Sequence, residues 1–183
     1  MSKKERGSAR TDVKIEDDGA TIKIGNYSAP STISDAQVIC RLDSTVTKID
    51  LTYCSEITDK TIISIAEKCP SIKEIHLSYC DKFTEESFKA IGSKCKLLEM
   101  FHAWDCANSF TEKGVEYLRG CESLRNLSVI NCGELSDHAV ELIVKSFPEL
   151  EYLRLTHCGI TSLPEDIGNH LKCLKQLNFG YNK

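Results

Sequence analysis

The sequence of 183 residues has little of what marks the commonest functional classes. It carries 23 Lys and Arg side chains against 27 Asp and Glu, which gives a formal net charge of −4. Nucleic-acid binding relies on a basic stripe that neutralises phosphates, so this composition predicts no nucleic-acid partner. The chain also lacks a run of about 18 apolar residues, and we therefore expect no membrane span.

Catalytic motifs are absent from the sequence as well. It contains no GxSxG, P-loop, HExxH or GxGxxG pattern. His157 directly precedes Cys158, but successive residues of a strand face opposite ways, so these side chains do not form a catalytic pair. No CxxC spacing supports a zinc site. We predict a protein that is not an enzyme and that has no cofactor.

The N-terminal segment MSKKERGSAR is polar, and no apolar stretch of a secretory signal follows it. We expect residues 1–10 to form a disordered tail. A mitochondrial presequence is disfavoured because Glu5 and Asp12 interrupt the basic character of this segment. The sequence therefore predicts a cytoplasmic or nuclear protein, in which thiols stay reduced.

Cysteine, in contrast, is abundant, and its spacing is regular. A first ladder has an interval of 26 residues and consists of Cys54, Cys80, Cys106, Cys132 and Cys158. A second ladder has the same interval, continues at Phe147 and consists of Cys69, Cys95 and Cys121. A fixed interval of this length is the signature of a repeat architecture. Cys40 and Cys173 stand outside both ladders, and Leu171 fits the next slot better than Cys173.

The same apolar pattern precedes every cysteine of the first ladder. It runs from VTKIDLTYC at 46–54 to LKQLNFGYN at 174–182, where Asn182 replaces the cysteine. This replacement indicates that the position has a hydrogen-bonding role. The pattern predicts a short strand, a turn and then a helix in each repeat. The expected helix N-caps are Thr58, Thr84, Thr111 and Ser136.

The string L-x-L-x-x-C-x-x-I/F/L-T/S-D/E resembles the cysteine-containing leucine-rich repeats of F-box proteins and of antagonist of mitotic exit network proteins. It covers about residues 46–159. The resemblance implies an α/β leucine-rich-repeat solenoid, a short curved right-handed coil with a parallel sheet on its concave face and helices on its convex face. We expect about five and a half repeats of 24–26 residues over residues 46–183.

Both ends of the repeat array differ from its middle. Residues 11–45 predict a capping hairpin and a degenerate first repeat, which cover the core of the solenoid at that end. In the third repeat Phe110 stands four residues after Cys106, whereas Ile57 stands three residues after Cys54. The segment GITSLPEDIGNHL departs further from the pattern and predicts a looser helix or a 3₁₀ segment.

The variable strand positions are expected on the concave face, where solenoids often bind their partners. This set holds the only Trp, four of the six Tyr and three of the five His. Apolar and aromatic residues concentrate around Met100, Trp104 and Ile130, as in binding hot spots. The predicted partner-binding residues are Asp50, Tyr53, His76, Tyr79, Met100, His102, Trp104, Asp105, Ile130, Tyr152, Arg154 and His157.

Three hypotheses of function stay open at this point. The first is a protein-interaction module, and the F-box resemblance implies substrate recognition for a ubiquitin ligase. The second is a structural or assembly subunit of a large axonemal or mitochondrial complex, since ATP synthase subunit s is similar in having a few such repeats. The third is a metal or redox protein that uses the stacked His76 and His102 or the cysteines.

Overall fold

The computed structural model describes residues 15–17, 19–24, 32–106 and 110–183. The tail expected at residues 1–10 lies outside these ranges. The strands are β1 (Ile15–Asp17), β2 (Thr21–Ile24), β3 (Lys48–Asp50), β4 (Glu74–Ser78), β5 (Met100–Trp104), β6 (Asn126–Ile130), β7 (Tyr152–Thr156) and β8 (Gln176–Asn178). The helices are α1 (Asp35–Ile39), α2 (Asp59–Lys68), α3 (Glu85–Lys94), α4 (Glu112–Leu118), α5 (Asp137–Ser146) and α6 (Ile167–His170).

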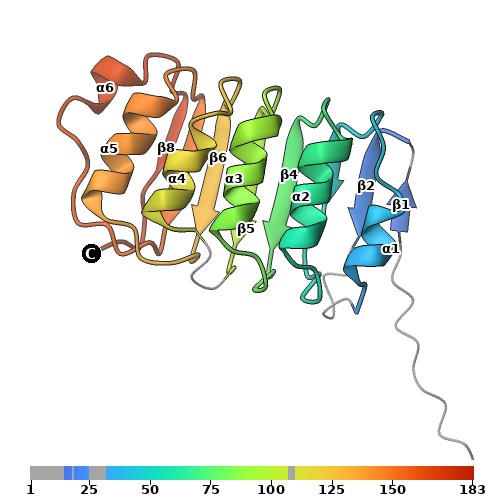
Figure 1. Ribbon diagram of the computed structural model, residues 1–183. Coiled ribbons are helices and arrows are strands. Elements are labelled where there is room, and N and C mark those ends of the chain that lie inside the picture. Colours follow the sequence, from blue (N-terminus) through green and yellow to red (C-terminus); the bar gives the residue numbers. More distant parts are fainter. Residues whose placement is uncertain (1–14, 18, 25–31, 107–109) are drawn as a thin grey trace, which may run out of the picture.

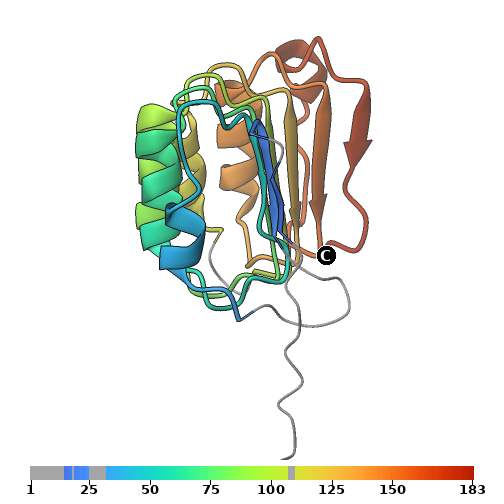
Figure 2. The same cartoon turned by 90° about the vertical axis from the view of Figure 1, so that its right-hand side faces the viewer.

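The strands form one open sheet in chain order. β2 to β8 are parallel, and β1 pairs antiparallel with β2 at one edge. The helices lie side by side on one face of this sheet, so the molecule has two layers (Figures 1 and 2). This arrangement confirms the predicted α/β solenoid. We call the face of the sheet opposite the helices the concave face.

The core lies between the two layers and is built from every second strand residue. Ile49, Ile75, Phe101, Leu127 and Leu153 pair in register on five neighbouring strands, and all of them are buried. The interval between paired residues is 26 along this series. Because side chains alternate across a strand, this register sends the intervening residues to the concave face in every repeat.

Four of the five cysteines of the first ladder join their repeat to the one before it, whereas Cys132 donates to the Ile130 carbonyl of its own strand. The Cys80 thiol donates a hydrogen bond to the Leu51 carbonyl, with Sγ 3.1 Å from the oxygen. Cys54, Cys106 and Cys158 make the equivalent bond to the preceding strand. Asn182 takes the same role, because its Nδ2 donates to the Leu155 carbonyl over 2.7 Å. The hydrogen-bonding role inferred for this position is thus confirmed.

The residue before each of these side chains has a left-handed backbone. The φ values lie between 51° and 65° at Tyr53, Tyr79, Asp105, Asn131, His157 and Tyr181. Only glycine adopts this conformation freely, and aspartate and asparagine tolerate it better than aromatic residues do. The turn it creates ends the strand and directs the next side chain into the core. The sequence pattern alone did not predict it.

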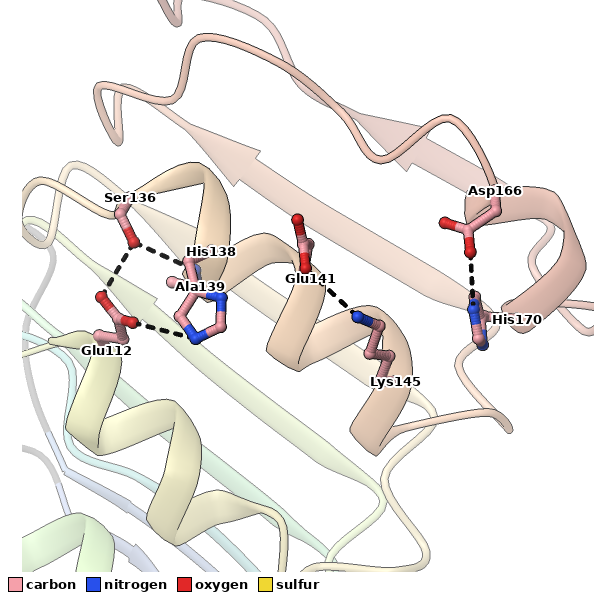
Figure 3. A network of polar contacts seen from close by, with 8 residues as sticks. All are labelled: Glu112, Ser136, His138, Ala139, Glu141, Lys145, Asp166 and His170. Atoms are coloured by element: carbon pink, nitrogen blue, oxygen red, sulfur yellow. Dashed lines mark hydrogen bonds and ion pairs between the residues drawn. The ribbon is translucent and has the colours of Figure 1, made fainter.

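A second set of contacts joins the helix N-termini. The predicted caps are confirmed, since the hydroxyls of Thr58, Thr84, Thr111 and Ser136 each accept a backbone N–H of their own helix. Each of these hydroxyls also donates to the acidic first residue of the preceding helix. Figure 3 shows this arrangement at Ser136, whose Oγ lies 2.9 Å from Glu112 Oε2.

The two irregular repeats are accommodated in different ways. Phe110 is buried in the slot that Ile57 fills in its own repeat. The extra residue before it is offset by α4, which has seven residues where α2, α3 and α5 have ten, so the interval from Cys106 to Cys132 stays at 26. In the last repeat, α6 is a single α-helical turn of four residues.

The helices α3 and α4 approach closely at their C-terminal ends. A methyl group at Gly92 would lie 1.8 Å from the Tyr117 carbonyl oxygen. The Lys96 ammonium holds the two chain segments together, because it donates to the carbonyls of Gly92 and Gly120 over 2.8 and 2.9 Å. Glycine is thus required at position 92 by space.

We predict that Gly92→Ala lowers the free energy of unfolding by about 3 kcal/mol, because the added carbon forces the backbone of α4 away. Gly168→Ala is the matched control, since no atom lies within 4 Å of the added carbon there. Urea unfolding followed by circular dichroism measures both changes. Equal effects of the two substitutions would show that the close approach is not a constraint.

Asp137 at the start of α5 gives the stability of the last repeat a pH dependence. Its carboxylate accepts hydrogen bonds from the hydroxyls and backbone N–H groups of Thr161 and Ser162. The hydrogen bonds from Thr161 and then Ser162 hold the pKa of Asp137 well below its usual range. A pKa lowered by folding stabilises the native state above the unfolded pKa of about 4, and this contribution is lost as the pH falls.

We therefore expect Asp137→Asn to lower the unfolding free energy most at pH 6–7, with the difference from the parent shrinking steadily toward pH 2. Urea unfolding at a series of pH values measures this difference. Asp81→Asn, at an exposed carboxylate that accepts no hydrogen bond in the described part of the chain, is expected to show no such trend. A gap at Asp137 that is independent of pH would contradict the assignment.

Candidate protein-binding face

The register of the parallel strands arranges the concave face in rows that run across the sheet. The central row places an acidic residue toward one end, two histidines in the middle and an arginine toward the other end. Its members, in order, are Lys23, Asp50, His76, His102, Ser128, Arg154 and Asn178. The six members from Asp50 to Asn178 follow one another in the sequence at intervals of 24 to 26 residues, so the repeat itself builds the row.

An aromatic wall flanks this row at the C-terminal ends of the strands. The rings of Tyr53 and Tyr79 are stacked, with centroids 4.3 Å apart and an angle of 7° between their planes. The Trp104 ring follows at 5.2 Å from that of Tyr79. Trp104 is 44% exposed although it is the most apolar member of the wall. Tyr53 and Tyr79 are half-buried. Aromatic groups gathered in this way at a surface are typical of a protein contact site.

Two hollows lie on the concave face and share His102 as a lining residue. The first has a volume of about 260 Å³, and Asp50, His76 and the aromatic wall line it. The second has a volume of about 230 Å³, and Tyr152, Arg154 and three amide side chains line it. Both are smaller than the pockets of roughly 300–1,000 Å³ that enclose whole small molecules, so each fits a single side chain better.

The two histidines of the row lie against each other, with ring centroids 5.8 Å apart. Burial, together with the neighbouring His76 and Arg154, lowers the pKa of His102, which favours a neutral imidazole. His76 Nε2 lies 3.6 Å from Glu74 Oε2. The described residues contain no group of three or more His, Cys, Asp or Glu side chains placed to hold a metal ion. The geometry thus favours the histidines as polar contact residues.

The remaining predicted residues take several positions around the hollows. Met100 is half-buried, and Tyr152 is 39% exposed. Asp105 accepts a hydrogen bond from Asn131 Nδ2 over 2.8 Å in the left-handed turns. His157 stacks on Tyr181, with ring centroids 4.7 Å apart. These turn residues form an edge of the concave face.

Ile130 does not belong to the exposed surface. Its register places it on the concave face between Trp104 and Thr156, but it is only 8% exposed. Neighbouring strands lie about 4.8 Å apart, so the side chains of adjacent strands close over it. Ile130 is therefore less accessible than its place on the concave face predicts, and the exposed part of the aromatic wall centres on Trp104, one strand toward the N-terminus.

The acidic residue after the N-cap joins neighbouring helices. An acidic side chain at this position interacts favourably with the helix dipole. In the structure Asp59 also accepts bonds from the Thr84 backbone N–H and from the hydroxyls of Thr84 and Ser87. The signal was present, because a small hydroxyl residue recurs three positions after the cap at Thr61 and Ser87, on the buried side of the helix.

The cysteines do not form a reactive cluster. All ten are free, and only Cys40 and Cys173 are exposed. Burial raises the pKa of Cys95 and Cys121 to about 12 and that of Cys69 and Cys158 to about 11. A thiol reacts as its thiolate, so these groups are inert at neutral pH. Cys40 follows α1 and Cys173 follows α6, at opposite ends of the solenoid (Figure 1), so they cannot pair within one chain.

We expect a thiol reagent such as 5,5′-dithiobis(2-nitrobenzoate) to modify two groups rapidly in the native protein and the other eight only on unfolding. Absorbance of the released thiolate counts the groups as they react. The Cys40→Ser/Cys173→Ser double variant is expected to lose the rapid phase entirely. Rapid reaction of a third thiol in the parent protein would show that a ladder position is open to solvent.

Comparison with known proteins supports this architecture. No helix of the described residues is both long and apolar enough to cross a bilayer. A search of curated proteins gave no significant match. The family model described as Leucine Rich Repeat matches residues 149–170, which run from just before β7 to the end of α6. Repeats of this type are typically non-enzymatic scaffolds for protein–protein interaction. The match and the open parallel sheet with its alternating helices identify the fold as a leucine-rich-repeat solenoid.

Proposed function

We propose that the protein is a non-enzymatic binding module that recognises a protein partner on its concave face. The observation that carries this proposal is the aromatic wall of Tyr53, Tyr79 and Trp104, in which Trp104 is exposed and the two tyrosines are half-buried, beside two hollows of side-chain size. An aromatic centre with a polar surround is the arrangement of a binding hot spot. The hollows are open and lined by neutral or singly charged groups, which suits recognition better than chemistry.

The resemblance of the repeats to those of F-box proteins extends this proposal to a biological setting. In that setting the concave face holds a substrate protein for a ubiquitin ligase in the cytoplasm or nucleus. In this proposal the concave face is the substrate-binding part of such a protein. Purification of the full-length protein from cells tests this setting, because ligase subunits should then co-purify together with the substrate.

A second function, that of a fixed subunit of a large assembly, has its own support. At the β8 edge Leu177 is 36% exposed and Tyr181 is 82% exposed. Apolar groups at an open sheet edge suit a permanent neighbour. Co-purification with one stable complex of constant composition supports this function, and substitution of Leu177 and Tyr181 by serine should then release the protein from that complex.

For the binding module, we predict that Trp104→Ala weakens partner binding about tenfold and leaves the unfolding free energy nearly unchanged, because the side chain is 44% exposed and lies outside the buried core. Quantitative affinity purification from cells, with the Trp104→Ala/Tyr79→Ala double variant alongside, measures partner binding. Leu97→Ala is the matched control, since Leu97 is an exposed apolar residue that follows α3 outside the concave face.

Two results would contradict the proposal. Retention of all partners by Trp104→Ala and by the double variant would move the binding site away from the concave face. Loss of partners by Leu97→Ala to the same degree would show that the effect is not specific to the aromatic wall. Thermal unfolding of each variant establishes that the folded protein is being compared.

A further inference from the structure

The central row of the concave face carries a carboxylate at Asp50 and a guanidinium group at Arg154. Asp50 and Arg154 form no ion pair within the described part of the chain, although ion pairs are common on the rest of the molecule. Lys48 and Glu74, which pair in register on the neighbouring strands β3 and β4, neutralise each other over 2.6 Å. Asp50 and Arg154 occupy the same row, four strands apart.

The first hollow suits a basic side chain. Asp50 Oδ1 accepts bonds from the backbone N–H and hydroxyl of Thr52, which fixes the carboxylate in place, and Oδ2 accepts no hydrogen bond from the described residues. The aromatic wall forms the side of the same hollow. A cation within about 6 Å of such rings is attracted by their faces, and a guanidinium group also stacks on them. Carboxylate and aromatic groups together therefore favour arginine over a neutral side chain.

The second hollow suits an acidic side chain. Arg154 is exposed and is the only charged residue that lines this hollow. The amides of Asn126, Gln176 and Asn178 surround it and can donate further hydrogen bonds to a carboxylate. A guanidinium group binds a carboxylate through two parallel hydrogen bonds when both partners are reachable. The two hollows thus prefer ligand groups of opposite charge.

The distance between the two charges defines the spacing of their ligands. Four steps of about 4.8 Å separate the strand of Asp50 from that of Arg154, which amounts to roughly 19 Å. An extended chain advances about 3.3 Å per residue, so it covers this distance in about six residues. Between Asp50 and Arg154 the row contains only His76, His102 and Ser128. With neutral imidazoles this part of the row carries no net charge, so it sets no charge requirement on the middle of the ligand.

We propose that the partner presents an extended segment across the strands, with a basic side chain in the hollow of Asp50 and Trp104 and an acidic side chain on Arg154, about six residues apart. This inference rests on the proposed function of the concave face. It adds the chemistry of the partner segment, which the fold by itself does not specify.

The test uses blocked ten-residue peptides of glycine, serine and alanine that carry one arginine and one glutamate at spacings from two to seven residues, in both orders. The single indole N–H of Trp104 and the side-chain Nε–H of Arg154 report binding by nuclear magnetic resonance at millimolar peptide. In one of the two orders, peptides whose arginine and glutamate are five to seven residues apart should bind about fivefold more tightly than the peptide in which they are two residues apart. A peptide with two glutamates is expected to leave the Trp104 signal unchanged.

Substitutions in the protein make the test specific. Asp50→Asn and Arg154→Gln should each remove the dependence on spacing, whereas Asp81→Asn and Arg119→Gln, at exposed charges outside the hollows, should preserve it. In the Asp50→Arg/Arg154→Asp double variant the preferred order of the two charges should reverse. General electrostatic attraction does not produce this reversal, so it identifies the two residues as the sites of contact.

The inference is overturned if the Trp104 signal does not shift at millimolar peptide, if affinity is independent of spacing, or if Asp50→Asn keeps the spacing dependence. Partner capture separates this outcome from failure of the proposed function. Loss of cellular partners with Trp104→Ala but not with Asp50→Asn or Arg154→Gln leaves the binding face in place and removes only the charge pattern. Retention of partners by Trp104→Ala removes both.

Discussion

The hydrogen bond from the strand-ending side chain to the carbonyl of the preceding strand, made by four of the five ladder cysteines and by Asn182, is the interaction on which the rest of the structure depends. Cys80 and Asn182 show its two chemical forms, a thiol and an amide donor in the same place. A carbonyl buried in the turn without a partner would cost about 1–3 kcal/mol, so the position requires a small donor that fits inside the core. This requirement, repeated every 26 residues, explains why cysteine is abundant in a protein that has no disulfide among its ten cysteines.

Constant register between neighbouring strands follows from this repeated bond, and the binding face follows from the register. A slip of one residue would exchange the core face of a strand for its concave face. The third repeat illustrates how strongly the interval is kept, because a shorter α4 offsets the displaced Phe110. Asp50, His76, His102 and Arg154 therefore reach a single row, although they are spread over more than 100 residues of sequence. The two hollows and their opposite charges are consequences of this order.

The sequence was sufficient for the fold because the fold depends on periodicity, which is visible without coordinates. It predicted the strands, the helix caps and the buried Leu171 in place of the exposed Cys173. It was insufficient for the left-handed turns, since Tyr53 and Tyr79 are not residue types that favour positive φ. It was also insufficient for Ile130, whose burial depends on the size of the side chains beside it. Periodicity identifies the face of a side chain, whereas exposure is set by neighbours from other repeats.

The central claim is that one unbroken register arranges the concave face, and interstrand nuclear Overhauser effects between backbone protons measure that register directly. The account predicts contacts between residues 26 apart from β3 to β7, such as Ile75 with Phe101 and Phe101 with Leu127, and 24 apart from β7 to β8. Contacts between residues 25 or 27 apart at the third repeat would place His102 and Ser128 on opposite faces of the sheet. That result would contradict the row of charges and the binding face built on it.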